Sequence, residues 1–176
     1  MAESLKRRII VDETDTIIGY KQSNSLKKDD WYRVSALWIT NSKGNILLAK
    51  RHHSKSHHPG KWGPAVAGTV DEGETYEENI IKEAEEELGL RNIKPTLGPK
   101  TRTDADYCHF TQWYLLNIDI EISLLKIQED EVEKVRWFSP PELHRQLQNH
   151  PDDFLPTMKK YFALFSSNSK KNSPEQ

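Results

Sequence analysis

Three glutamates in one short segment are the residues of this sequence best suited to chemistry. Glu83, Glu86 and Glu87 stand at positions i, i+3 and i+4 of a predicted helix over residues 75–88, so their carboxylates gather on one side of it. They occupy its last turns, where the negative end of the helix dipole disfavours each anion by about 0.3–1 kcal/mol. A hard divalent cation reverses this balance, because Mg²⁺ and Mn²⁺ prefer oxygen ligands. The spacing therefore predicts a metal site for an anionic substrate.

The segment before the glutamates supplies the other half of such a site. It reads GTVDEGE, and its glycines, Gly68 and Gly73, permit unusual backbone angles and close approach of main-chain groups to a ligand. The helix then begins at Thr75, which forms a capping box with Glu78, and ends at Gly89. Loop and helix together predict a metal cradle. The apolar face of the helix is predicted to contain Ile80, Ile81, Ala84 and Leu88.

This segment resembles the Nudix box of the Nudix hydrolases. Gly68, five residues, Glu74, seven residues and then KEAEEELGL from Lys82 match the box over 23 consecutive residues. The family has Arg where Lys82 stands. Lys keeps the positive charge but lacks the planar guanidinium group that can bind a carboxylate with two parallel hydrogen bonds. The motifs PGKWG and VRWFSPPEL on either side also recur in the family. The resemblance implies an α/β class fold, an α/β/α sandwich with a mixed β-sheet, to which residues 9–20 add an N-terminal β-hairpin.

The resemblance also implies roles for individual residues. Glu74 would be structural and would pair with Lys82. Many members draw one more carboxylate, as metal ligand or base, from a downstream loop, where the spacing to Trp137 favours Glu131 and then Glu129. The ligands of a catalytic Mg²⁺ or Mn²⁺ would be Gly68, through its carbonyl, Glu83, Glu86 and Glu87.

The implied reaction is hydrolysis of a phosphoanhydride, in which water must reach a phosphorus that already carries negative charge. Metal ions screen the phosphate oxygens, and a carboxylate removes the proton from the water. Arg51 is the first candidate to hold the diphosphate and Lys55 the second. The expected substrate is a nucleoside diphosphate linked to another moiety, or a related diphosphate.

Two other functions stay open. The stretch AKRHHSKSHHPGKWGPAVAG looks closer to isopentenyl-diphosphate isomerase, which has the same fold but needs a Cys, a Gly and a metal-binding His where Ala67, Gly68 and Thr69 stand here. Gln112 also replaces the second catalytic carboxylate of that enzyme. A non-catalytic nucleotide-binding module is the other alternative, and Lys82 is its only support.

Other reactive residue types are assigned no site. Residues 51–63 are rich in His but offer no acidic or Cys partner in register, so these histidines are not predicted to bind metal. Trp31, Trp62 and Trp113 are expected in the core. Cys108 is expected to be a small buried hydrophobe, and as the only cysteine it excludes an intrachain disulfide and fits a reducing cytoplasm.

Composition favours one domain that acts on a small molecule. A net charge of −2 gives no strong nucleic-acid signal, and the apolar patch near the N-terminus is far too short for a membrane span. A diphosphate is thus the expected partner, and a homodimer is compatible with the sequence. We predict a flexible N-terminus over 1–8, the hydrolase domain over 9–165 and a disordered tail over 166–176.

Local patterns also predict the elements that must position the site. Beyond the hairpin and the glutamate helix, hydrophobic runs and turn residues predict strands over 31–40, 46–50, 64–68 and 134–138, one or two strands within 101–122, and helices over 140–147 and 153–165.

Overall fold

A computed structural model describes residues 6–104 and 107–169 of the chain. Residues 1–8 and 166–176, predicted as flexible ends, lie partly outside that description. Within it, regular structure begins at Arg7 and ends at Ser169. The elements are β1 (Arg7–Val11), β2 (Ile17–Gln22), β3 (Trp31–Thr40), β4 (Ile46–Arg51), β5 (Trp62–Pro64), β6 (Val66–Thr69), α1 (Tyr76–Leu88), β7 (Thr96–Asp104), β8 (Cys108–Asn117), β9 (Val132–Phe138), α2 (Pro140–Asn149) and α3 (Met158–Ser169).

Strand β3 organises a mixed sheet that has nine strands in the described part of the chain. Along one edge it pairs in turn with β1, β6 and β4, all antiparallel, and along the other edge it pairs with β8 in parallel. The predicted N-terminal hairpin is confirmed as the antiparallel pair β1–β2. Because β3 contacts so many strands, it fixes the position of β6, which carries Gly68.

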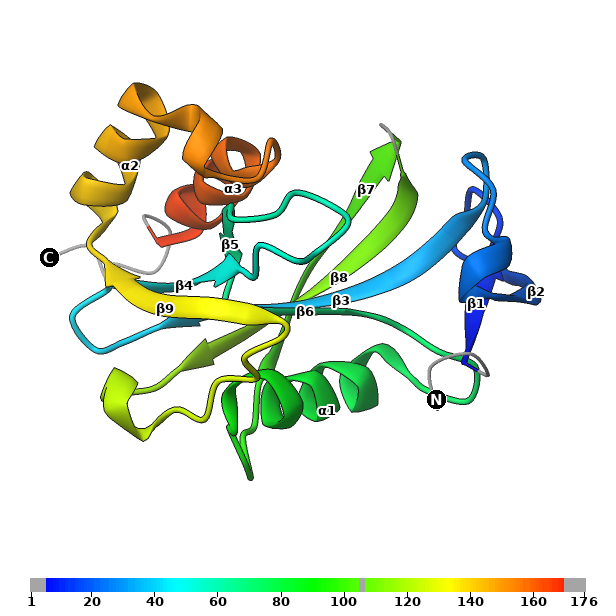
Figure 1. Cartoon of the computed structure of the whole chain (residues 1–176), viewed down its shortest axis with the longest axis horizontal. Coiled ribbons are helices and arrows are strands. Elements are labelled where there is room, and N and C mark those ends of the chain that lie inside the picture. The colour runs from blue at the N-terminus through cyan, green and yellow to red at the C-terminus, as the bar shows by residue number, and fades with distance from the viewer. Residues whose placement is uncertain (1–5, 105–106, 170–176) are drawn as a thin grey trace, which may run out of the picture.

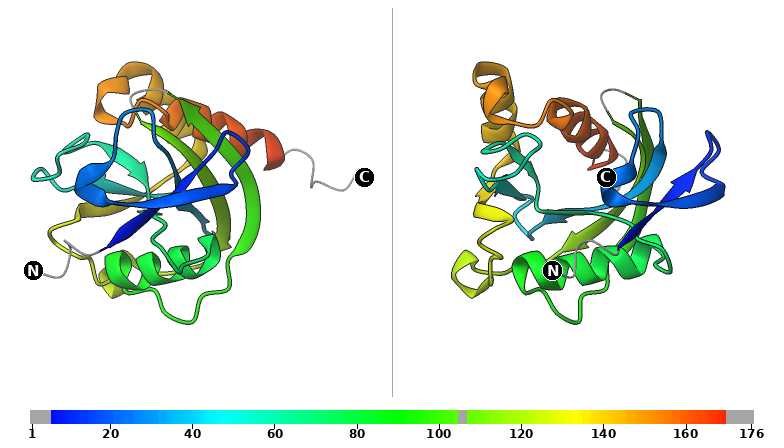
Figure 2. Two further views of the ribbon diagram at one scale, coloured as in Figure 1. Left: turned by 90° about the vertical axis from the view of Figure 1, so that its right-hand side faces the viewer. Right: turned by 45° about the vertical axis from the view of Figure 1, so that its right-hand side comes forward.

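The sheet lies between helices on its two faces, so the expected α/β/α sandwich is confirmed. Helix α1 covers one face, and α2 and α3 cover the other (Figures 1 and 2). Successive side chains of β3 point to opposite faces of the sheet. Leu37 and Ile39 therefore pack toward α1, whereas Ala36 and Trp38 pack toward α2 and α3. None of the described helices is long and apolar enough to cross a membrane.

The tip of the hairpin is tied to the start of α1 by a largely buried carboxylate. Asp15 accepts hydrogen bonds from the Tyr76 hydroxyl, from Arg33 Nε and from Lys100 Nζ. Burial and the neighbouring Asp15 charge raise the pKa of Tyr76 far above its ordinary value, so this hydroxyl remains a donor. These contacts connect the turn between β1 and β2 with β3, β7 and α1, and they hold the first turn of the helix in place.

Several details differ from the sequence-based expectations. The single strand predicted over 64–68 is divided into β5, which pairs with β4, and β6, which pairs with β3. Ile81 is exposed, and Asn79 takes its expected place among the buried residues of α1. The last helix begins at Met158, not at 153, because Pro156 lacks the N–H that an earlier start would use. Cys108 is half-buried at the start of β8 and not fully buried as predicted.

The end of α1 is fixed by an incoming loop. Gly89 has φ of +68°, the left-handed conformation that ends the helix, and donates to the carbonyl of Glu85. The N–H groups of Lys126 and Gln128 then donate to the last free carbonyls of the helix, at Leu88 and Glu87. This capping brings residues 126–131 next to the glutamates of α1.

Substitution of Gly89 tests this helix end. An added Cβ would lie 2.8 Å from the Lys126 Cβ in a backbone conformation that disfavours side chains. We expect Gly89→Ala to reduce the free energy of unfolding by about 1–2 kcal/mol in urea denaturation. Gly19→Ala is the matched control, since no atom lies within 4 Å of its added Cβ. Equal losses in the two variants would contradict this account.

Candidate metal and phosphate site

The site forms where the second half of α1 passes over strand β6. A Cβ added at Gly68 would lie 2.4 Å from Glu83 Cγ and 2.8 Å from its Oε1, so the Glu83 carboxylate rests directly on the glycine backbone. Burial raises the pKa of Glu83, nearby Lys82 opposes the shift, and Glu86 adds to it. Only glycine at position 68 leaves room for this carboxylate.

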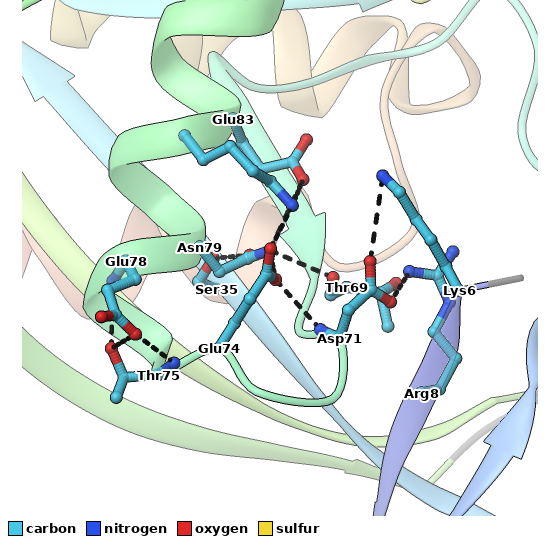
Figure 3. Close-up of polar contacts among 11 residues, drawn as sticks. Lys6, Arg8, Ser35, Thr69, Asp71, Glu74, Thr75, Glu78, Asn79 and Glu83 are labelled. Carbon is cyan, nitrogen blue, oxygen red and sulfur yellow. Dashed lines mark hydrogen bonds and ion pairs between the residues drawn. The ribbon is translucent and has the colours of Figure 1, made fainter. Parts of the chain in front are cut away.

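The loop between β6 and α1 is anchored on both sides, as Figure 3 shows. Asp71 binds Arg8 of strand β1, and the N–H of Glu72 donates to the carbonyl of Arg7. Glu74 Oε2 accepts from the N–H of Asp71 at 3.1 Å within the loop and from Asn79 Nδ2 of α1 at 2.8 Å. The loop is therefore held between the hairpin and the helix.

Glu74, Asn79 and Lys82 form the framework beneath Glu83. Lys82 Nζ lies 2.5 Å from Glu74 Oε1 and 3.4 Å from Glu83 Oε1, and Asn79 Nδ2 donates to Glu74 Oε2 at 2.8 Å. Burial acts to raise the pKa of Glu74, but hydrogen bonds from Lys82, Asp71 and Asn79 hold it below its ordinary value. Glu74 is thus an ionised anchor that fixes the Lys82 ammonium beside Glu83.

Glu87 is the most electrostatically stressed carboxylate of the group. Burial, together with the negative charges of Glu83 and Glu131, raises its pKa to about 8. The N–H of Ala67 and the charge of Lys55 act in the opposite direction without cancelling the shift. An additional cation at this point would relieve the repulsion.

The downstream loop brings Glu131 to the same place. Its carbonyl accepts from the N–H of His52 at 3.0 Å, and its carboxylate lies 2.5 Å from Lys55 Nζ. Glu131 and its partner Lys55 both act on the charge of Glu87, so this pair lies near the glutamates of α1. Glu129, the second choice from the sequence, is exposed on the same loop.

The remaining predicted residues lie at the edge of this cluster. Glu86 is exposed on α1 and acts electrostatically on Glu83. Arg51 ends strand β4, and its Nε donates to the His57 carbonyl at 3.0 Å, which closes the histidine-rich loop. Of the two cations predicted to hold the diphosphate, Lys55 is the one that contacts a carboxylate of the cluster.

The donor set fits a hard divalent cation. It consists of carboxylate oxygens beside a glycine backbone, and its net charge is negative. In the arrangement seen over residues 6–104 and 107–169, no three His, Cys, Asp or Glu side chains already converge as a metal cage. Glu83 and Glu131 each face an ammonium group, from Lys82 and Lys55. Side-chain rotation is therefore needed to bring the carboxylates onto one ion.

Sequence reasoning missed one residue of this site and one contact between two predicted residues. Asn79 is fully buried, accepts from the Ser35 hydroxyl and donates to the Thr69 carbonyl and to Glu74. A polar residue on the otherwise apolar face of a helix was the signal that could have identified it. The Lys55–Glu131 pair joins residues 76 positions apart, and nothing in the local sequence indicates it.

The contact between Gly68 and Glu83 yields a direct prediction. In Gly68→Ala the new methyl group displaces the Glu83 carboxylate, so we expect Mg²⁺ affinity, measured by calorimetry, to fall about 10- to 100-fold. Thermal melting should confirm that the variant still folds, because the Glu83 side chain can rotate away. Ala67→Ser is the control, since adjacent residues of a strand point to opposite faces. Unchanged Mg²⁺ affinity in Gly68→Ala would refute the assignment.

The raised pKa of Glu87 predicts a pH-dependent stability. The folded state holds this proton more tightly than the unfolded state, so the stabilisation is complete below the ordinary value of 4.5 and is lost as pH rises through about 8. Without divalent cations, Glu87→Gln should therefore exceed the wild type in unfolding free energy by about 2 kcal/mol at pH 9.

Near pH 5, where Glu87 is protonated in the folded protein, the two should differ little. Urea denaturation in EDTA at both pH values measures this difference. Glu85→Gln, at an exposed position of the same helix, should show no such dependence on pH. If Glu87→Gln differed from the wild type by the same unfolding free energy at both pH values, the claim that the folded protein raises the pKa of Glu87 would be ruled out.

Comparison with known proteins identifies the family of this chain. The NUDIX domain pattern matches residues 31–161. The chain is 27% identical to an uncharacterised Nudix hydrolase of Yersinia pestis over 89% of this chain and 83% of that protein, and 32% identical to one of Nostoc over 81% and 86%. The crystal structure of DR0079 from Deinococcus radiodurans matches with a TM-score of 0.71 and 25% identity, covering 82% of this chain and 90% of that one. The chain belongs to the Nudix family, and it is a hydrolase that acts on phosphoanhydride bonds.

Proposed function

We propose that this protein is a Mg²⁺- or Mn²⁺-dependent hydrolase of a nucleoside diphosphate linked to another moiety, or of a related diphosphate. Enzymes of its family generally use a divalent metal ion and act on small diphosphate-containing molecules. The observation that carries the proposal is that Glu83 and Glu87 lie against the backbone of β6, while Glu131, from a distant segment, acts on the charge of Glu87. Such a cluster of anions suits a cation that carries phosphate.

The residues of the cluster divide the work of hydrolysis. The metal ion supplies positive charge that screens the phosphate oxygens and favours ionisation of the attacking water. Gly68, Glu83, Glu86 and Glu87 would hold it. A carboxylate accepts the proton as water adds to phosphorus and the anhydride P–O bond breaks, and Glu131 is our candidate for this base or for a further ligand of the metal ion. Lys55 and Arg51 are the cations that hold the other phosphate.

Lys82 is compatible with this role although the family box has Arg there. The ammonium group lies between Glu74 and Glu83, at 2.5 and 3.4 Å from their nearest oxygens. It therefore keeps the link between the structural glutamate and the ligand glutamate. This supports catalysis over the non-catalytic nucleotide-binding module, for which Lys82 was the only argument.

The isomerase alternative has weaker support at its decisive positions. Ala67 is exposed on β6 where the isomerase needs its cysteine, and it has no nucleophilic or acidic atom. Gln112 donates to the carbonyls of Gly98 and Trp113, so its amide serves the β7–β8 pairing and supplies no carboxylate. An isomerase-like branch of the family thus describes general similarity only, with hydrolase chemistry at the site.

A substrate panel with matched variants tests the proposal. We expect Mg²⁺-dependent release of phosphate-containing products from at least one nucleoside diphosphate derivative, followed by chromatography. Glu86→Gln and Glu87→Gln should lower turnover at least about 100-fold. Glu85→Gln removes an exposed charge of α1 that pairs with Arg91, and this variant should retain the wild-type turnover.

The other outcomes identify the alternatives. Alkene isomerisation of isopentenyl diphosphate would support the isomerase, and tight nucleotide binding without products would support the non-catalytic module. Equal turnover in the Glu85, Glu86 and Glu87 variants would remove the proposed site.

A further inference from the structure

One ammonium group serves two carboxylates at the edge of the site. Lys55 Nζ lies 2.5 Å from Glu131 Oε2, and the two side chains are 27% and 30% exposed. Lys55 also attracts the charge of Glu87, which Glu131 repels. The ammonium group therefore lies where it partly neutralises Glu87 and Glu131 together.

The backbone around this pair is fixed by hydrogen bonds. The N–H of His52 donates to the Glu131 carbonyl at 3.0 Å, and the N–H of Lys55 donates to the His52 carbonyl at 3.2 Å. The lysine side chain, in contrast, is a flexible stem of four carbons that ends in a compact ammonium group. The ion pair can therefore open by side-chain rotation while both loops keep their places.

The second lysine of the cluster differs in this respect. Lys82 is held by Glu74 as well as Glu83, and Glu74 is itself fixed by Asn79 and the N–H of Asp71. A cation that binds Glu83 leaves Lys82 with an ionised partner. A cation that binds Glu131 competes for the carboxylate that Lys55 contacts.

We propose that a divalent cation displaces Lys55 from Glu131 and that the released ammonium group then binds a phosphate of the diphosphate substrate. The cation and the ammonium group carry like charge and use the same oxygens, so they exclude each other at Glu131. The displaced lysine remains beside the phosphates that the cation holds. This inference rests on the proposed function, and it makes Lys55 a link between metal binding and substrate binding.

A double-mutant cycle on metal binding tests the exchange without any substrate. Mg²⁺ affinity is measured by calorimetry for the wild type, Lys55→Met, Glu131→Gln and the double variant. We expect Lys55→Met to bind Mg²⁺ about threefold tighter than the wild type. In the Glu131→Gln background, the same change should bring no gain. An equal gain in both backgrounds, as from a general change in charge, or no gain in either, would overturn the proposal.

Lys50→Met is the matched control for this cycle. Lys50 pairs with Glu133 at 3.0 Å, with similar exposed fractions of 26% and 34%, but on the neighbouring strands β4 and β9. Its removal should leave Mg²⁺ affinity as in the wild type. A gain as large as that of Lys55→Met would also count against a specific exchange.

The second half of the proposal is tested with methylenediphosphonate, a diphosphate that water does not cleave. With Mg²⁺ saturating, Lys55→Met should bind this probe at least about fivefold more weakly, although it binds the metal more tightly. Unchanged probe affinity would overturn the transfer of Lys55 to phosphate. If the exchange and the probe results hold while no diphosphate in the panel is hydrolysed, the proposed function fails and the exchange stands.

Discussion

Mutual repulsion among partly buried carboxylates is the constraint on which this structure depends. Glu83, Glu87 and Glu131 lie close enough to influence one another, and burial keeps water from screening them fully. A helix end already carries partial negative charge, so the last turns of α1 are an unfavourable place for these residues. The arrangement has a clear physical use if it takes up a cation that is bound to phosphate.

The rest of the fold holds these charges in place. Strand β3 fixes β6, whose glycine leaves space for Glu83, and the hairpin anchors the loop that enters α1. At the other end of the helix, backbone hydrogen bonds from residues 126 and 128 position the loop that carries Glu131. Two lysines limit the repulsion, Lys82 as part of a fixed framework and Lys55 from a loop across the site.

Features with a local cause could be predicted from the sequence. The hairpin and α1 followed from β-branched runs, a capping box and Gly89, and the structure agrees because these signals lie within a few residues of one another. The spacing of the glutamates likewise predicted that they share one side of the helix. The exposed Ile81 shows the limit of periodicity, since the sheet and loop neighbours of α1 decide which residues become buried.

Features that depend on distant partners could not be predicted in this way. The order of the strands, the burial of Asn79 beneath Glu74 and the contact between Lys55 and Glu131 all arise when separate segments meet. From side-chain type alone, Arg51 was preferred to Lys55 as the cation that holds the diphosphate. In the structure, Arg51 Nε donates to the loop carbonyl of His57. Residue types indicated the chemistry, but the tertiary fold decides which cation faces which carboxylate.

Anomalous diffraction from crystals soaked in Mn²⁺ would test the central claim most directly. The account predicts a manganese peak beside the Gly68 carbonyl, within bonding distance of Glu83 or Glu87. A peak at another place on the protein, or an absent peak at saturating Mn²⁺, would contradict the claim that these carboxylates are kept together to bind a metal ion.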